Sequence, residues 1–153
     1  MSALPQHQPQ FRKMSYEDLI AICRIEPTIY SHPWTYGNFK DSLDSGYSAW
    51  VMEMAGEIIG YALVMMVLDE AHLLNVSVSQ HYQGQGLGRA LLAQMITVAR
   101  QRLATNMFLE VRASNTKAIG LYEAMGFCEM GIRRHYYPTS QGREDAVLMG
   151  LAL

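Results

Sequence analysis

The sequence has little of what a secreted, membrane-spanning or nucleic-acid-binding protein needs. Only 2 of its 153 residues are cysteines, too few for a disulfide framework. Its longest apolar run, Tyr61 to Leu68, is far shorter than the roughly 20 residues that span a bilayer. Charged residues make up 17% of the chain and the net charge is −2. This balance disfavours nucleic acid as the main partner, because phosphate binding depends on Lys and Arg.

Residues 1–10 also lack the positive flank and apolar core of a signal peptide, and they are rich in Pro and Gln. We therefore expect a disordered tail over 1–10, one domain over 11–153 and a cytoplasmic protein with both thiols reduced. The 5 histidines show no metal-ligand spacing, so no metal is expected. Half of the residues are hydrophobic, as in a globular domain that folds without a metal or disulfide.

Hydrophobic patterning and turn residues divide the chain into alternating strands and helices. Ser15 is a candidate N-cap for a first helix that ends near Ile25, because Pro27 follows. Another short helix is expected over 35–43, and longer ones over 88–103 and from Asn115 to Gly126. The pattern predicts a single α/β or α+β domain with a mixed sheet, whose strands are expected at 11–14, 48–54, 58–67, 73–78, 107–111, 127–134 and 146–151.

The stretch YQGQGLGRALL, residues 82–92, places glycine at 84, 86 and 88 between an expected strand and an expected helix. Unpaired N–H groups at a helix N-terminus attract anions, and glycine lets the backbone approach them closely. Arg89 adds a positive charge. A phosphate or pyrophosphate is the expected ligand, although a tight turn that needs glycine for backbone reasons alone is the alternative.

Nucleotides fit this loop poorly. A Walker loop would end in Gly-Lys-Ser/Thr, whereas this one ends in Gly88-Arg89-Ala90. A dinucleotide fingerprint needs its third glycine three positions after the second, and here the interval is two. ATP, GTP and NAD are therefore disfavoured.

Gln83, Gly86 and Gly88 resemble the Gln/Arg-x-x-Gly-x-Gly/Ala signature of the Gcn5-related N-acetyltransferases. The segments VLDEAHLLNVSV, LEVRASNTKAIGLYEAMGF and IRRHYYPTSQGREDA are similar to the branch of that family that acetylates the N-terminal alanine of a small-subunit ribosomal protein, the eighteenth in the standard naming. The resemblance implies one domain with a mixed, mostly antiparallel sheet flanked by helices. It also implies acetyl-CoA as cosubstrate and direct transfer to an α-amine in a ternary complex.

The same resemblance implies a set of coenzyme contacts. The backbone of 76–78 would pair with the pantetheine arm and polarise the thioester carbonyl, and 84–89 would hold the pyrophosphate. Asn115 would touch the coenzyme while capping its helix. The full implied set is Val76, Ser77, Val78, Gln83, Gly84, Gln85, Gly86, Leu87, Gly88, Arg89 and Asn115.

Two residues are candidates for proton transfer. Strand alternation puts Glu110 on the face opposite Leu109 and Val111, so it is either solvated or directed into a cleft. Tyr122 lies on the apolar face of its helix, where a core tyrosine with a satisfied hydroxyl is the simpler interpretation. The resemblance implies that Glu110 is the general base and that Tyr122 is the general acid that protonates the thiolate.

The acceptor site is the least determined part. The aromatic residues from Tyr30 to Phe39, among them Trp34, and the pair Tyr136 and Tyr137 could wall a peptide groove, form a second core or make a dimer contact. Cys128 lacks an activating neighbour and is expected to be a buried strand residue rather than a nucleophile. Acetylation of a lysine or polyamine, a non-catalytic acyl-CoA-binding module and a nucleotide switch remain as alternative functions. Neither nucleic acid nor a membrane is expected as a partner, and the oligomeric state is undetermined.

Overall fold

The computed structural model describes residues 8–153. Most of the tail predicted over 1–10 falls on residues 1–7, outside the described part, and the first strand begins at Gln10. None of the helices within 8–153 is both long and apolar enough to cross a lipid bilayer.

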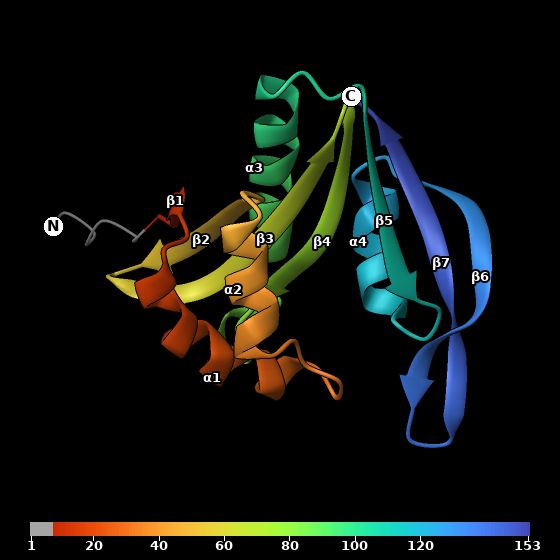
Figure 1. Cartoon of the computed structure of the whole chain (residues 1–153), viewed down its shortest axis with the longest axis horizontal. Helices are drawn as coiled ribbons and strands as arrows, with labels where there is room; N and C mark the ends of the chain where they lie inside the picture. Colours follow the sequence, from red (N-terminus) through yellow and green to blue (C-terminus); the bar gives the residue numbers. More distant parts are fainter. Residues whose placement is uncertain (1–7) are drawn as a thin grey trace, which may run out of the picture.

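Seven strands form one sheet in the order β1-β2-β3-β4-β5-β7-β6 (Figure 1). Neighbouring strands are antiparallel except β4 and β5, which are parallel. This confirms the expected mixed, mostly antiparallel sheet. The strands are β1 (Gln10–Lys13), β2 (Ser48–Met54), β3 (Glu57–Val67), β4 (Glu70–Val78), β5 (Asn106–Arg112), β6 (Cys128–Thr139) and β7 (Gly142–Ala152).

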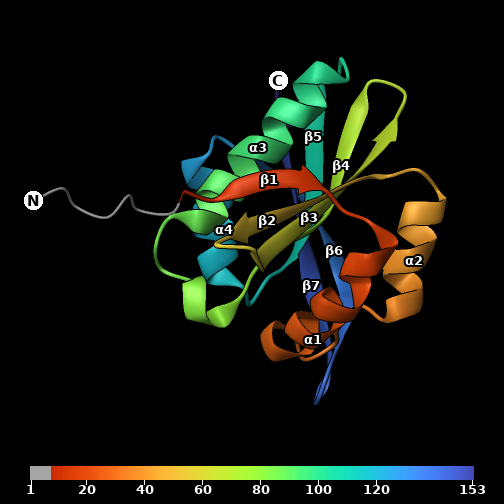
Figure 2. The same ribbon diagram turned by 90° about the vertical axis from the view of Figure 1, so that its left-hand side faces the viewer.

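Four helices cover the two faces of the sheet. Helices α1 (Leu19–Ile29) and α2 (Tyr36–Asp44) lie on one face, while α3 (Leu87–Gln101) and α4 (Thr116–Ala124) lie on the other (Figure 2). Each face therefore has its own hydrophobic core. Phe39 and Tyr61 belong to the core under α1 and α2, and Leu91 and Met95 belong to the core under α3.

The prediction that Pro27 ends the first helix was wrong. Proline has no N–H and crowds the carbonyl four residues before it, but here it lies in the last turn. The Tyr30 N–H still donates to the Glu26 carbonyl at 3.1 Å, and the Thr28 hydroxyl donates to the Ile25 carbonyl at 2.6 Å. These bonds carry α1 through to Ile29. A single turn of 3₁₀ helix, Tyr16–Asp18, precedes it after Ser15.

The C-terminal hairpin of β6 and β7 is longer than the sequence pattern predicts, because its polar turn is part of the ladder at Thr139 and Gly142. Strand β6 is the edge of the sheet and most of its residues are exposed. Cys128, its first residue, is exposed too, which corrects the expectation of a buried cysteine. Both Cys23 and Cys128 are free thiols, as expected.

The centre of the sheet opens where its two parallel strands separate. Glu70 to Leu73 pair with Asn106 to Leu109, but β4 beyond Leu73 has no partner on β5. An irregularity in the pairing of β4 with β3 falls at the same point, since Leu63 faces Asn75 and Val64 faces Leu73. Bulges bend the strand that carries the extra residue, here Leu74. The second half of β4 therefore diverges from β5 (Figure 1).

Candidate active site

The glycine-rich loop forms one wall of the cleft between the separated strands. Gly84 and Gly86 have φ values of +78° and +80°, which favour glycine, and Gly86 is the N-cap of α3. Within residues 8–153, the N–H groups of Gly84 to Gly86 donate to no backbone carbonyl. The Gln83 side chain donates to the Val78 carbonyl at 2.9 Å and so ties the loop to β4. The loop is thus an open cradle of donors at the positive end of a 15-residue helix.

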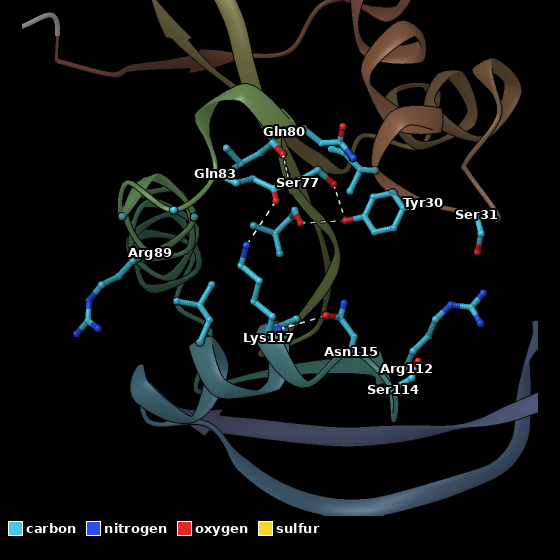
Figure 3. A pocket seen from close by; sticks show the side chains of 18 of the residues that line it. Tyr30, Ser31, Ser77, Gln80, Gln83, Arg89, Arg112, Ser114, Asn115 and Lys117 are labelled. Atoms are coloured by element: carbon cyan, nitrogen blue, oxygen red, sulfur yellow. Dashed lines mark hydrogen bonds between the residues drawn. The ribbon is translucent and has the colours of Figure 1, made fainter.

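A first cavity of about 640 Å³ lies between this loop, β4 and α4 (Figure 3). Lys117 reaches across it, with its ammonium nitrogen 3.5 Å from the Gln83 amide oxygen. Arg89 lies at the rim of the same cavity. Asn115 lines the cavity and caps α4, because its side-chain oxygen accepts from the Ala118 N–H at 3.2 Å. The cavity therefore combines backbone donors with three positive side chains, because Arg112 lines it as well, and this composition suits a phosphorylated ligand.

The β4 wall of the cavity is held from behind by buried polar groups. The Tyr30 hydroxyl donates to the Val76 carbonyl at 3.2 Å and lies 2.8 Å from the Ser77 hydroxyl. The Ser77 hydroxyl donates to the Asn75 side-chain oxygen at 2.6 Å. Burial raises the pKa of Tyr30, which keeps this hydroxyl protonated as a donor.

Glu26 anchors the same network, with only 1% of its surface exposed. Its carboxylate accepts from the Tyr61 hydroxyl at 2.7 Å, the Asn75 amide at 3.3 Å and the Trp34 N–H at 2.9 Å. All three partners are donors, so both oxygens of the Glu26 side chain accept hydrogen bonds. Glu26 thus connects the Trp34 loop to β4.

A second cavity of about 350 Å³ opens between the separated halves of β4 and β5. It shares Tyr30, His32, Val76, Arg112 and Asn115 with the first cavity, so the two are continuous. Glu110 and Tyr122 both line this second cavity. Of the two interpretations left open for Glu110, the one directed into a cleft is therefore correct.

Tyr122 is buried, and none of the side-chain hydrogen bonds around the second cavity involves its hydroxyl. Its ring packs edge-on against Phe127 with 5.7 Å between centroids. Burial raises the pKa of Tyr122, and the neighbouring hydroxyls of Tyr30 and Tyr137 raise it further. The side chain is thus a core tyrosine by packing whose hydroxyl remains protonated and available at the cavity.

A third cavity of about 540 Å³ continues from Glu110 to strands β6 and β7. Glu110, Leu109 and Tyr137 line both the second and the third cavity, while Tyr136 lines only the third. Burial raises the pKa of Tyr137 to about 12, with a smaller contribution from the Glu110 charge. Glu110 is also 3.6 Å from the Arg133 guanidinium. Its carboxylate therefore lies where the second and third cavities meet.

Arg112 braces the wall between these cavities. Its guanidinium donates to the Pro138 carbonyl at 2.9 Å, pairs with Glu144 at 3.0 Å and lies 4.5 Å from the centre of the Tyr137 ring. Glu144 also accepts from the Ser114 N–H, and these contacts lower the pKa of the Glu144 carboxyl. The salt bridge fixes the β6–β7 hairpin against the end of β5.

The structure brings most of the sequence-predicted site residues together. Gln85 and Leu87 are the exceptions, because the Gln85 side chain is exposed beside the first cavity rather than in its lining and Leu87 is buried in the α3 core. Trp34 lines the second cavity and also packs on Phe39 in the second core. The other predicted residues line one or more of the three cavities, namely Val76, Ser77, Val78, Gln83, Gly84, Gly86, Gly88, Arg89, Asn115, Glu110, Tyr122, Tyr136 and Tyr137.

Sequence reasoning missed Arg112, Lys117 and Glu26, and it placed Tyr30 only among the aromatic residues of a possible peptide groove. Only Glu26 leaves a signal, because it continues the buried face of α1 after Leu19 and Ile22 at helical spacing. Cys128 lines none of the three cavities. Within residues 8–153, no group of three or more His, Cys, Asp or Glu side chains is arranged to hold a metal ion.

A split mixed sheet with an anion-binding glycine loop on one side and a carboxylate and a tyrosine at the junction defines a class of transferase that uses a phosphorylated acyl donor. The model of the acetyltransferase (GNAT) family matches residues 14–127. The chain belongs to this family.

Several relatives share most of the chain. The [ribosomal protein bS18]-alanine N-acetyltransferase of Escherichia coli K12 is 44% identical over 136 residues, which cover 89% of this chain and 92% of that protein. The Haemophilus influenzae protein of the same name is 38% identical over 137 residues, covering 89% and 93%. The crystal structure of the ribosomal-protein-S18-alanine N-acetyltransferase from Escherichia coli superposes with a TM-score of 0.89 at 41% identity, covering 95% of this chain and 94% of that one.

Proposed function

We propose that this acetyltransferase moves an acetyl group from acetyl-CoA to the N-terminal α-amino group of an alanine-starting ribosomal protein, bS18. The names of relatives at 38% to 44% identity support the acceptor. The observation that carries the chemistry is the continuity of the cavities, because Glu110 and Tyr122 line the space between the glycine loop and the outer groove. A ribosomal acceptor would also make the reaction cytoplasmic.

The first cavity fits the coenzyme. Free N–H groups at Gly84 to Gly86 and the N-terminus of α3 would hold the pyrophosphate, and Arg89 and Lys117 supply compensating charge. The unpaired edge of β4 at Val76 to Val78 would hydrogen-bond the pantetheine arm. The coenzyme supplies an activated acetyl thioester, and β4 N–H groups would polarise its carbonyl.

Glu110 would act as the base. An α-ammonium group has a pKa of about 7.7 to 8.0, so roughly a tenth of it is neutral at pH 7, against about 0.04% for a lysine. One carboxylate at the junction of the cavities therefore suffices to take the remaining proton, directly or through water. Glu110 can pass that proton outward, because the third cavity is open to solvent.

Tyr122 would act as the acid. Its raised pKa keeps its proton in place at neutral pH, and none of the side-chain hydrogen bonds around the second cavity involves its hydroxyl. A hydroxyl directed at the departing sulfur can donate to the thiolate as it forms. A non-catalytic acyl-CoA-binding module would need neither Glu110 nor Tyr122.

Two peptides test the proposed function. One carries a free N-terminal alanine and no lysine, and the other is N-terminally blocked but contains lysine. After incubation with acetyl-CoA, intact masses should show one added acetyl group on the first peptide only. Acetylation of the second peptide alone would replace the acceptor class, and acetylation of neither peptide by protein that binds acetyl-CoA would favour the non-catalytic module.

A further inference from the structure

Strand β6 contains an irregular stretch directly before the second of its two tyrosines. Arg133 pairs with Ala146 and Tyr137 pairs with Glu144, so the three residues between them on β6 face only Asp145 on β7. Within this bulge His135 has a φ of +52°, a conformation that residues other than glycine rarely adopt. Such conformations persist where the surroundings hold them, and they concentrate at functional sites.

Side chains from β7 satisfy the backbone groups that the bulge leaves unpaired. The Asp145 carboxylate accepts from the His135 N–H at 2.9 Å. The Arg143 guanidinium donates to the carbonyl of His135 at 2.7 Å and to that of Tyr136 at 2.8 Å. These three contacts pair backbone groups that the bulge takes out of the ladder, and His135, Arg143 and Asp145 line none of the three cavities.

The bulge determines where the two tyrosines point. Consecutive side chains of a regular strand project to opposite faces, yet the rings of Tyr136 and Tyr137 are in edge contact with 4.9 Å between centroids. Both rings line the third cavity beside Glu110. The nearby Glu110 carboxylate raises the pKa of the Tyr136 hydroxyl, whereas burial, followed by the charge of Glu110, raises the pKa of the Tyr137 hydroxyl. A regular β6 would turn one of the two rings away from this cavity.

We propose that Asp145 and Arg143 are positioning residues of the acceptor site, which hold the β6 bulge so that both tyrosines face the incoming peptide. The inference rests on the proposed function, because it takes the third cavity to be the acceptor groove. Neither residue touches a substrate. Their loss should weaken peptide binding and leave coenzyme binding and the chemical step intact.

Steady-state kinetics with an alanine-starting peptide test this proposal. Asp145→Ala and Arg143→Ala should each raise KM for the peptide by about three- to tenfold, the effect of one or two lost hydrogen bonds. Values of kcat and the Kd for acetyl-CoA should stay within about twofold of wild type. Asp145→Asn retains a side-chain oxygen for the His135 N–H and should restore a near wild-type KM.

A matched control separates positioning from charge. Arg134 lies in the same bulge and carries the same charge, but its side chain makes none of the hydrogen bonds that hold the bulge. Arg134→Ala should therefore leave KM unchanged. An equal rise in KM for Arg134→Ala and Arg143→Ala would overturn the proposal in favour of a charge effect, as would a failure of Asp145→Asn to restore KM in a protein of unchanged melting temperature.

Tyr137→Ala distinguishes failure of this inference from failure of the proposed acceptor site. A raised peptide KM in Tyr137→Ala together with wild-type kinetics in Asp145→Ala would leave the acceptor site standing and reject the positioning role. Wild-type peptide KM in both variants would instead reject the third cavity as the acceptor groove. Raised KM in both, with kcat preserved, is the result that we expect.

Discussion

The inner and outer cavities of this protein are assembled from different parts of the chain. The inner cavity, which is the first one, takes most of its anion-binding groups from one strand, turn and helix N-terminus over residues 76–89, and Lys117 is added from α4. The groups over 76–89 are mainly backbone N–H. The outer cavities, which are the second and the third, combine side chains from β4, β5, β6 and β7. The inner cavity can thus bind one ligand, the coenzyme, through local backbone geometry. The shape of the outer cavities depends on tertiary packing, so it can change with the acceptor.

Tyr122→Phe should have the largest effect, because Tyr122 is the proposed acid and lines the second cavity, which is continuous with the first. Without the hydroxyl, kcat should fall about 100-fold, the lower end of what general acid catalysis contributes. Acetyl-CoA affinity, measured by calorimetry, should be nearly unchanged, since the inner cavity is intact. Unchanged turnover would reject Tyr122 as the acid.

Gly86→Ala should damage the inner cavity alone. The φ of +80° strains any other residue by roughly 1 kcal/mol, although a Cβ would meet open space. A shift of the loop backbone should weaken acetyl-CoA binding by about tenfold and leave KM for the peptide unchanged.

Gly46→Ala is the matched control for this variant, because Gly46 also has a positive φ and open space but lies before β2, away from the cavities. It should lose similar thermal stability and keep wild-type coenzyme affinity. Equal losses of acetyl-CoA affinity in the two variants would contradict a backbone cradle at 84–86.

Glu110→Gln should lower kcat/KM by about tenfold near pH 7 and by less as the pH rises. The reason is that the α-amine loses its own proton at about pH 8, after which a base is no longer needed. A pH–rate profile that parallels the wild type at every pH would remove Glu110 as the base.

The smallest expected change is in the alkaline limb of the wild-type profile. The pKa of Tyr122 is raised and that of Tyr137 is raised to about 12, so both hydroxyls keep their protons well above neutral pH. Activity that needs a protonated tyrosine is lost only as the pH rises through these raised values. The value of kcat should therefore stay level between about pH 8 and pH 10. A fall in that interval, measured on protein shown to be folded, would contradict the assignment.

The contrast between the regions also explains what could be predicted from the sequence. The glycine loop was predictable because its residues are adjacent and because Gly84 and Gly86 have positive φ values, which favour glycine. Glu110 and Tyr122 follow from alternation and helical spacing only as positions on a face, and the family resemblance supplied their roles. The separation of β4 from β5 depends on an extra residue at Leu74, which leaves no mark in the hydrophobic pattern.

The other differences between the predicted and the observed structure also have physical causes. Pro27 fits inside α1 because neighbouring groups satisfy the backbone around it. Cys128 is exposed because β6 became the edge of the sheet, and strand order is not readable from a single strand. The bulge in β6 depends on Asp145 and Arg143 across the hairpin, whereas the sequence pattern predicts a strand that ends at residue 134.

The central claim is that coenzyme and peptide occupy the continuous cavities together, so that the acetyl group passes directly between them. A matrix of initial rates, with acetyl-CoA varied at several fixed concentrations of the alanine-starting peptide, tests this claim. Double-reciprocal lines that intersect are the predicted result, because both substrates must be bound before transfer. Parallel lines, together with an acetylated enzyme detected by mass in the absence of peptide, would show a covalent intermediate and contradict direct transfer.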